Sequence, residues 1–529
     1  MQAPAGNFRP ASLRRALSTW SVGALSVLGL LLAGCGSSEV VYRDRPPFNA
    51  APDTGSGLLG YYTVSTKQTT CGNCHAGHQA DWSTTKHAGA FATLVASGRA
   101  TPACYQCHTL NEHGNGLTKA SGWNVKSDSG YQDVQCESCH GPGAKHVALT
   151  ENRANWPLAR LTLFNASASC ASCHTGIHTP FAEEWATSGH AKLETAPINN
   201  TTSNCKNCHE GKTALASWGV VTNYQERDSA AVKSPHTCAV CHNPHGSTNS
   251  HQLRYPINTP DPDQNLCMKC HLNRGEPTAT SSTPHGAAGY VLLGVAGYRP
   301  AGVSIDTQVV LTTHASIANP KLCAGCHVVA FDVTDPATGG FVFHSTGHSF
   351  RPLPCVDATG KPTGQTDCAY NTTERTFKTC TTSGCHGTAA VAASLLSSQR
   401  ATIAAMADVI WLDLNHNQTI DAAPVDGGYL AIIKRDRPTE LSTTTVLTPA
   451  RGAQFNVLLF AERGYGHGDN SFTVHNPFLA RALLAANITE LRATYALPAP
   501  PAQVQVLMDH AVTDAKARSP KFFRTASTK

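Results

Sequence analysis

Apolar residues gather near the two ends of this 529-residue chain. Ala16–Leu32 is a mostly apolar run close to the N-terminus. Three segments near the C-terminus are rich in apolar residues at helical spacing: Ala389–Leu412, Asn476–Tyr495 and Ala502–Ala515. They predict three helices within a cysteine-free, mostly helical C-terminal segment, 388–529.

The N-terminal run has the layout of a secretory signal, because three arginines and no acid precede it within residues 1–15. It ends in Leu32-Ala33-Gly34-Cys35, which resembles the bacterial lipobox; this resemblance implies cleavage before Cys35 and lipidation of that residue. We therefore predict a lipoprotein signal peptide at 1–34 and a lipidated tether at 35–60. A plain signal peptide and an uncleaved signal anchor are the alternatives, although the run is short for a spanning helix.

Cysteine and histidine dominate the middle of the chain, which holds most of the 21 cysteines and 26 histidines. Eight times, two cysteines separated by two residues are followed at once by histidine, the attachment signal of c-type haem. The two thiols bind the vinyl groups of one porphyrin, and the next imidazole reaches its iron. Numbered as sites 1 to 8, these are Cys71, Cys74 and His75; Cys104, Cys107 and His108; Cys136, Cys139 and His140; Cys170, Cys173 and His174; Cys205, Cys208 and His209; Cys238, Cys241 and His242; Cys267, Cys270 and His271; and Cys323, Cys326 and His327.

A ninth site is predicted at Cys380, Cys385 and His386, where four residues separate the cysteines. This resembles the expanded haem-binding variant of some multihaem cytochromes. Zinc sites and disulfide scaffolds also use cysteine pairs, but neither explains a histidine after every second cysteine. Nine haems c are the cofactors predicted here.

Three cysteines remain outside these sites. Cys35 belongs to the predicted lipid anchor. Cys355 and Cys368 flank a loop rich in Gly, Pro and Thr, and neither is followed by histidine. In an oxidising compartment this arrangement predicts a disulfide that closes the loop.

The first six sites form two similar triplets, in which consecutive first cysteines lie 32 to 35 residues apart. Trp82 and His87 follow site 1 as Trp185 and His190 follow site 4. We interpret this as an internal duplication. The predicted organisation is two similar three-haem modules at 61–255, then a three-haem module with wide spacing at 256–387.

About one attachment site for every 35 residues between 71 and 386 leaves too little peptide for a conventional core. We expect the porphyrins to form the core, with short helices at the attachment sites joined by long loops. The predicted fold class is mainly α with much irregular loop, a multihaem cytochrome c architecture with a helical C-terminal segment.

Each iron needs a second axial ligand, and 17 histidines do not follow an attachment pair. His87 and His190 occupy matching places in the repeat. His245 lies only three residues after His242, which favours ligation of a neighbouring haem. His78, His178 and His344 are rivals, and a surface or propionate-contacting role is the alternative for any single residue. The predicted distal ligands are His87, His113, His146, His190, His245, His285, His314, His348 and His475.

Two motifs within residues 70–275 resemble known multihaem families. CESCHGPGAKH at 136–146 is similar to a motif of the tetrahaem cytochromes of nitrifying bacteria. CHNPHGS at 241–247 is similar to the decahaem cytochromes of porin–cytochrome conduits, which implies that His245 is a haem ligand. The chain departs from those decahaems by its nine sites, its expanded site 9 and its long C-terminal segment.

Two smaller features lie in the C-terminal segment. Val474-His475-Asn476-Pro477 resembles a segment of nitrite-reductase-like multihaem enzymes, which implies that His475 ligates a haem; an ordinary histidine at a helix start is the alternative. The oxygen-bearing residues of 413–421 resemble the first part of an EF-hand calcium loop, but Pro424 stands where its bidentate Glu belongs. A calcium site and a polar loop are both open, with the candidate ligands Asp413, Asn415, Asn417 and Asp421.

Charge gives no argument for a nucleic-acid partner. The formal net charge is +5, and removal of the three N-terminal arginines leaves 37 basic against 35 acidic residues, or +2. With about −1 for each ferric haem and its propionates, the nine-haem protein is acidic, at about −7. Gly36 rather than Asp follows the lipobox cysteine, which in lipoproteins implies transfer to the outer membrane; three acyl chains would hold the protein there.

Two functions remain open. The first is electron transfer across or at the outer membrane, in extracellular or anaerobic respiration, with other redox proteins, a porin or an extracellular acceptor as partners. The second is reduction of nitrite, hydroxylamine or a sulfur oxyanion, which needs one iron with an open axial position. The surplus of histidines favours electron transfer, and site 9 is where the second function would be expected. A polymerising cytochrome filament is a third interpretation.

Overall fold

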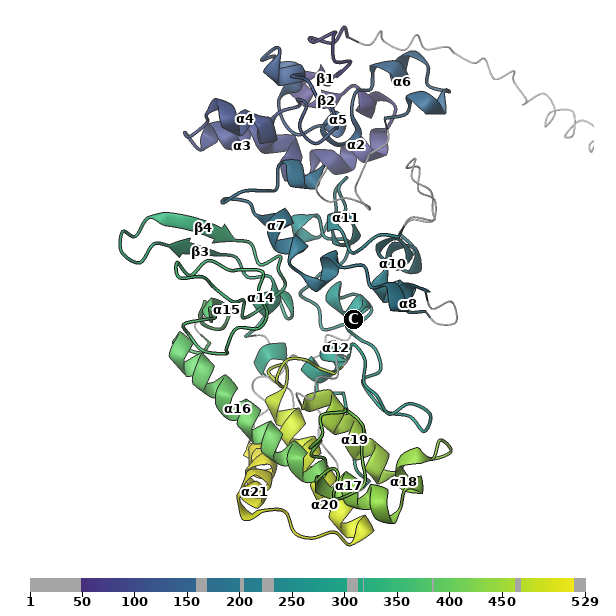
Figure 1. Cartoon of the computed structure of the whole chain (residues 1–529). Helices are drawn as coiled ribbons and strands as arrows, with labels where there is room; N and C mark the ends of the chain where they lie inside the picture. The colour runs from purple at the N-terminus through teal and green to yellow at the C-terminus, as the bar shows by residue number, and fades with distance from the viewer. Residues whose placement is uncertain are drawn as a thin grey trace, which may run out of the picture. The chain divides into compact units, whose positions relative to one another are not determined.

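The computed structural model describes residues 49–157, 169–199, 204–220, 233–301, 313–316, 318–382, 385–461 and 468–517. The predicted signal peptide and Cys35 lie outside these ranges. The chain divides into residues 1–49 and 50–529, and the second unit is described below. Its fold is mainly helical with long irregular stretches and two small sheets (Figure 1), which confirms the predicted fold class. Among its described helices, none combines the length and hydropathy needed to cross a bilayer.

Short helices and turns carry sites 1 to 6. An antiparallel pair, β1 (Tyr61–Thr63) and β2 (Gln68–Thr69), precedes site 1. The apolar clusters here hold only three buried residues each, such as Leu58, Leu110 and Tyr131. This is expected where porphyrins supply the core. The helices are α2 (Ala76–Ser83), α3 (Ala90–Ala96), α4 (Pro102–His108), α5 (Cys136–His140), α6 (Ala144–Ala148), α7 (Phe181–Ala186), α8 (Thr195–Asn199), α9 (Lys206–His209), α10 (Gly211–Ser217) and α11 (Cys238–Cys241).

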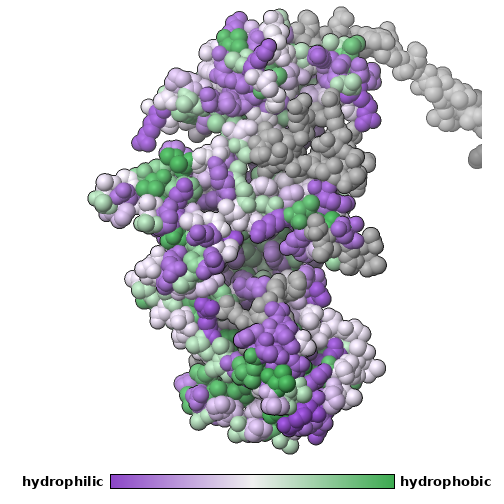
Figure 2. Space-filling view, in the orientation of Figure 1, coloured by the Kyte–Doolittle hydropathy of each residue, from purple (hydrophilic) through white to green (hydrophobic). Residues whose placement is uncertain are grey.

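The segment of sites 7 to 9 adds a hairpin to this pattern. Strand β3 (Phe331–Thr334) pairs antiparallel with β4 (Phe341–Ser345), with Val333 opposite Phe343. Figure 2 shows an apolar patch over this hairpin, where Phe341 is 44% exposed. Cys355 and Cys368, which were predicted to pair, are joined by a disulfide. The helices are α12 (Ala288–Leu292), α14 (Ala324–His327) and α15 (Lys378–Thr381).

The C-terminal segment contains the largest apolar cluster of the described chain, formed by its long helices together with α12. The three predicted helices are α16 (Ala389–Ile410), α20 (Pro477–Tyr495) and α21 (Ala502–Ala517). The side chain of Thr388 caps α16 by accepting from Val391 N, and Asn476 caps α20, which has proline at its first position. The structure adds α17 (Gly428–Asp436), α18 (Thr439–Ser442) and α19 (Pro449–Phe460).

Hydrogen bonds connect this helical segment to the residues that follow site 7. The buried side chain of Asn456 accepts from Tyr298 N at 2.8 Å and donates to Tyr298 O at 2.8 Å. It also donates to Asn487 of α20 at 2.7 Å. The C-terminal helices are therefore hydrogen-bonded to the segment between sites 7 and 8.

Candidate haem-binding sites

The attachment motifs of sites 1 to 8 each fold as a helical turn. In site 1, His75 N donates to Cys71 O at 2.9 Å, and the same bond recurs in sites 4 to 8. A turn with this i to i−4 bond places residues i, i+3 and i+4 on one side. Both thiols and the imidazole therefore face the same space, as one porphyrin requires.

Eight of the nine histidines that follow attachment cysteines face a second imidazole. Two metal–nitrogen bonds of about 2 Å, with about 1 Å from each nitrogen to its ring centre, put imidazoles that share one iron about 6 Å apart. The observed separations of ring centroids match this value. They are 6.4 Å for His75–His146, 6.1 Å for His140–His245, 6.1 Å for His174–His87, 5.8 Å for His209–His285, 6.4 Å for His242–His348, 6.1 Å for His271–His190, 6.0 Å for His327–His475 and 6.0 Å for His386–His314.

Hydrogen bonds at Nδ1 leave Nε2 of several proximal histidines unprotonated, as iron ligation requires. Nδ1 of His140, His242 and His327 lies 2.8–2.9 Å from a backbone carbonyl, to which it donates when protonated. This leaves the lone pair on Nε2, which is then free to bind a metal. Burial, and then the neighbouring imidazole, lowers the pKa of His87 to about 4, so the ring is neutral and able to ligate at neutral pH.

A cavity lies between α2 and the segment that follows site 6. It measures about 570 Å³ and is lined by α2 and by residues 243–255, including Asn243 and Arg254. His245 lies within that segment. Gly246 makes the approach to α2 feasible, because its φ is +129° and a Cβ there would lie 2.5 Å from Asp81 O. The fit to haem comes instead from the facing imidazole pairs, each of which has attachment cysteines directly before its proximal histidine.

Comparison with known proteins agrees with this geometry. The family model of cytochrome c554 and c-prime matches residues 70–141, and the doubled CXXCH motif matches residues 230–275. The chain is a multihaem c-type cytochrome.

Curated relatives of the cytochrome are distant. Multiheme cytochrome MtrA of Shewanella baltica is 28% identical over 215 residues, which cover 37% of this chain and 59% of MtrA. C-type polyheme cytochrome OmcB of Geobacter sulfurreducens is 25% identical over 286 residues, or 49% of this chain and 35% of OmcB. The polyheme cytochrome OmcC of that organism is 29% identical over 206 residues, 32% of this chain and 26% of OmcC. The aligned region thus spans less than two thirds of each relative, and no solved structure matches the cytochrome.

Site 2 differs from the other eight. Nδ1 of His108 lies 2.8 Å from Ala90 O, yet no imidazole of the described chain faces its ring. His113, predicted as a distal ligand, follows a turn in which Asn111 Oδ1 accepts from His113 N, and it makes no ring contact with His108 among the described residues. The sequence pointed to site 9 as the place for an open iron if the protein were a reductase. The structure places His314 opposite His386 there and leaves site 2 without a facing imidazole.

The two segments that were interpreted as an internal duplication share a hydrogen-bond pattern. Trp82 Nε1 donates to Val134 O at 2.9 Å, and Trp185 Nε1 donates to His236 O at 2.7 Å. Both acceptors stand two residues before the first cysteine of the third site in a triplet. The backbone N–H groups of Val134 and His236 in turn donate to the carbonyls of His87 and His190, at 3.2 and 3.0 Å. The same contact therefore positions a distal candidate in each module.

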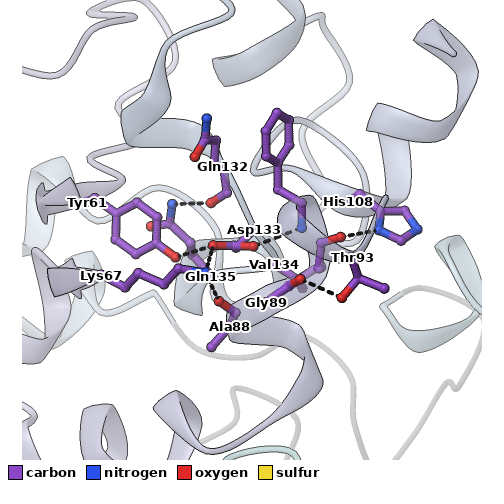
Figure 3. Close-up of polar contacts among 12 residues, drawn as sticks. Tyr61, Lys67, Ala88, Gly89, Thr93, His108, Gln132, Asp133, Val134 and Gln135 are labelled. Atoms are coloured by element: carbon purple, nitrogen blue, oxygen red, sulfur yellow. Dashed lines mark hydrogen bonds and ion pairs between the residues drawn. The ribbon is translucent and has the colours of Figure 1, made fainter. Parts of the chain in front are cut away.

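A buried carboxylate connects the first three sites (Figure 3). Asp133 accepts from Tyr61 Oη at 2.8 Å and Phe91 N at 2.8 Å, and it pairs with Lys67 Nζ at 2.9 Å. Burial, followed by the charge of Asp133, raises the pKa of the Tyr61 hydroxyl. Asp133 lies between site 2 and site 3, and no sequence pattern singled it out.

A second carboxylate supports site 8. His475 Nδ1 lies 2.6 Å from Asp469 Oδ1, and the Asp469 side chain is 1% exposed. Burial lowers the pKa of His475, but the Asp469 charge and hydrogen bond outweigh it, so the net shift is upward. Asp469 follows no motif, which is why the sequence gave no reason to choose it.

The rival histidines occupy other environments. The ring of His78 lies 4.4 Å from that of His245, too close for two ligands of one iron. His178 stacks on Phe341 with ring centroids 4.9 Å apart, and His344 Nδ1 pairs with Asp332 at 2.6 Å.

The candidate calcium loop brings its four residues together. Asp413 accepts from Asn417 N and Gln418 N, while Asp421 accepts from the side-chain amides of Asn415 and Asn417. No group of three or more His, Cys, Asp or Glu side chains in the described ranges has metal-binding geometry. Calcium at this loop stays a prediction.

Proposed function

We propose that this cytochrome carries nine haems c, is exported and lipid-anchored at the outer membrane through Cys35, and transfers electrons across or at that membrane in extracellular or anaerobic respiration. The observation that carries the proposal is the set of eight facing imidazole pairs. An iron held between two histidines has both axial positions filled, so it exchanges electrons without binding a substrate. Its partners would be other redox proteins, a porin or an extracellular electron acceptor.

Intact-mass measurement tests the haem count. Each covalent haem adds about 616 Da to the polypeptide. We expect nine additions in the purified protein and eight in a Cys380→Ser/Cys385→Ser variant. A wild-type mass that fits eight haems would remove site 9 from the proposal.

Fractionation tests the anchor. The wild-type protein should remain with outer membranes, whereas Cys35→Ser should appear in the soluble fraction, because the acyl chains that hold it are lost. Haem content should be equal in both proteins. An unchanged distribution of Cys35→Ser would contradict lipidation.

Site 2 supports one second candidate, a reductase of nitrite, hydroxylamine or a sulfur oxyanion. His108 has no facing imidazole among the described residues, so an iron there would have room for a small ligand. Electron paramagnetic resonance of the oxidised protein separates the two functions. The reductase is favoured if the spectrum shows one high-spin ferric haem per protein that becomes low-spin when nitrite or hydroxylamine is added. A fully low-spin spectrum would favour electron transfer as the function.

A further inference from the structure

Helix α7 places a buried carboxylate against residues 345–350, the ligand loop, which carries His348. Glu184 of α7 is 7% exposed, and it accepts from four donors of this loop. Ser345 Oγ donates at 2.8 Å, Thr346 N at 3.0 Å and Thr346 Oγ1 at 2.6 Å. His348 N donates at 2.8 Å. These donors lie 161 to 164 residues after Glu184 in the chain, so the contact is tertiary.

Hydrogen bonds rather than ion pairs compensate the charge of this carboxylate. None of the ion pairs within the described ranges includes Glu184. A buried carboxylate is costly unless donors fill its lone pairs, and the four donors of the ligand loop do so. Displacement of the loop would leave a buried charge without partners, so Glu184 favours one position of the loop.

The ligand loop contacts imidazoles of three attachment sites. His348 faces His242 of site 6 at 6.4 Å. Phe350 O lies 2.9 Å from Nδ1 of His327, the proximal histidine of site 8. The ring of Phe350 also contacts His190, which faces site 7, with centroids 4.5 Å apart. Of these histidines, His348 is the one whose own backbone is bonded to Glu184.

Helix α7 contacts His348 a second time, through Phe181. The ring of Phe181 meets the His348 ring edge-on at 4.7 Å. Phe181 and Glu184 are three residues apart on α7, so their side chains lie on the same face of the helix. One face of α7 therefore holds both the backbone and the imidazole of His348.

The first module seats the loop of a distal histidine at the matching position. Asp81 precedes the repeated tryptophan of α2 as Glu184 precedes that of α7. Gly246, next to His245, comes so close to α2 that a Cβ there would lie 2.5 Å from Asp81 O. His245 faces site 3 as His348 faces site 6. The contact is made by glycine packing in the first module and by a carboxylate in the second.

We propose that Glu184 is a positioning residue for haem site 6, where its carboxylate fixes His348 opposite His242 so that one iron binds both imidazoles. This rests on the proposed function, which requires a six-coordinate haem at that site. Glu184 itself does not ligate the iron. It acts through the backbone of the ligand loop.

Electron paramagnetic resonance of the oxidised protein tests this role. Glu184→Gln keeps the size of the side chain, but it removes the charge and replaces one acceptor oxygen by an amide group that donates. We expect His348 to leave the iron, which gives up to about one high-spin ferric haem more than in the wild type at unchanged intact mass. Carbon monoxide should bind to that haem in the reduced protein.

His348→Ala supplies the reference, because it removes the ligand itself. The double variant Glu184→Gln/His348→Ala should show no more high-spin haem than His348→Ala, since both changes act on one iron. Glu183→Gln is the matched control: Glu183 is the exposed neighbour on α7, and it accepts from Gly176 N instead of the ligand loop. Glu184→Asp should restore part of the low-spin signal, because it keeps the charge and both acceptor oxygens.

A wild-type spin state and wild-type carbon monoxide binding in Glu184→Gln would overturn the proposal. A double variant with more high-spin haem than His348→Ala would also overturn it, because Glu184 would then act on another iron. If Glu184→Gln does not assemble its haems, Ser345→Ala removes one of the four donors. It should bind carbon monoxide faster than the wild type, and an equal rate would overturn the proposal. Haems missing from the wild-type mass would instead contradict the proposed function.

Discussion

The imidazole of His87 lies 6.1 Å from that of His174, although His87 belongs to the first module and His174 to the second. The backbone of Val134, which holds His87 in place, is itself fixed by Trp82. An iron held between these two imidazoles would join the two predicted modules. Among the described residues, the apolar clusters of these two modules hold three buried side chains each, so haem insertion and module assembly are expected to depend on each other.

Replacement of His87 by alanine should open one axial position at site 4. The oxidised His87→Ala protein should show about one high-spin ferric spin more than the wild type, because its iron keeps only His174. Electron paramagnetic resonance measures the change, and carbon monoxide binding to the reduced protein gives a second readout. His178→Ala is the matched control, since His178 stacks on Phe341 instead of facing a proximal histidine. An unchanged spin count in His87→Ala would contradict its role as a ligand.

Asp469→Asn should raise the reduction potential of the haem at site 8. A carboxylate that accepts from His475 Nδ1 makes the imidazole a stronger donor and stabilises ferric iron, and the amide removes that charge. Spectroelectrochemical titration measures the shift. Asp332→Asn is the control, because His344, its partner, faces no proximal histidine in the described chain. A titration curve of Asp469→Asn that superimposes on the wild type would rule out this tuning.

Sequence patterns predicted the parts of this protein that depend on local spacing. The attachment motifs of sites 1 to 8 are local, because one helical turn carries the whole thiol–thiol–imidazole set. The helices α16, α20 and α21 were predicted because their apolar spacing extends over several turns. The duplication was visible because Trp82 and Trp185 keep their distances to His87 and His190.

The remaining features depend on contacts that no local pattern carries. Asp133 and Asp469 are ordinary acids in the sequence, and only folding brings Tyr61 or His475 to them. The pairing of histidines was also hidden, since His87 faces His174 across the boundary between the predicted modules. Helices α17 and α19 were missed because their burial depends on packing against α16 and α20.

Trp82→Phe and Trp185→Phe should destabilise the protein to a similar degree. Each change removes an indole N–H and leaves a carbonyl acceptor without its donor, which costs about 1–3 kcal/mol. Guanidinium unfolding followed by circular dichroism measures the free energy of unfolding. Trp218→Phe is the control. Tyr255 Oη donates to the backbone carbonyl of Trp218, and the substitution keeps that carbonyl. If only one of the two variants lost stability, the structural equivalence of the modules would be in error.

Loss of the disulfide should destabilise the segment between sites 8 and 9. Cys355 and Cys368 are 13 residues apart, and closing a loop of that length stabilises the fold by about 3 kcal/mol in the chain-entropy model. The double variant Cys355→Ser/Cys368→Ser should unfold at lower denaturant, with the same haem mass. Mild reductant should destabilise the wild type and leave the double variant unchanged; equal sensitivity of both would point to another target of reduction.

Glu490→Gln should flatten the pH dependence of stability. Burial raises the pKa of Glu490 above 4.5 although Ala301 N and Tyr298 Oη donate to it, and its Oε2 is buried without a hydrogen-bond partner. The native state then holds this proton more tightly than the unfolded state. The free energy of unfolding should therefore fall as pH rises from the unfolded pKa to the native one, by about 1.4 kcal/mol for each unit between them. Glutamine cannot ionise, so the variant should lack this decline. Thermal unfolding of both proteins from acidic to neutral pH, followed by circular dichroism, measures the difference in slope, and parallel curves would show that Glu490 titrates normally.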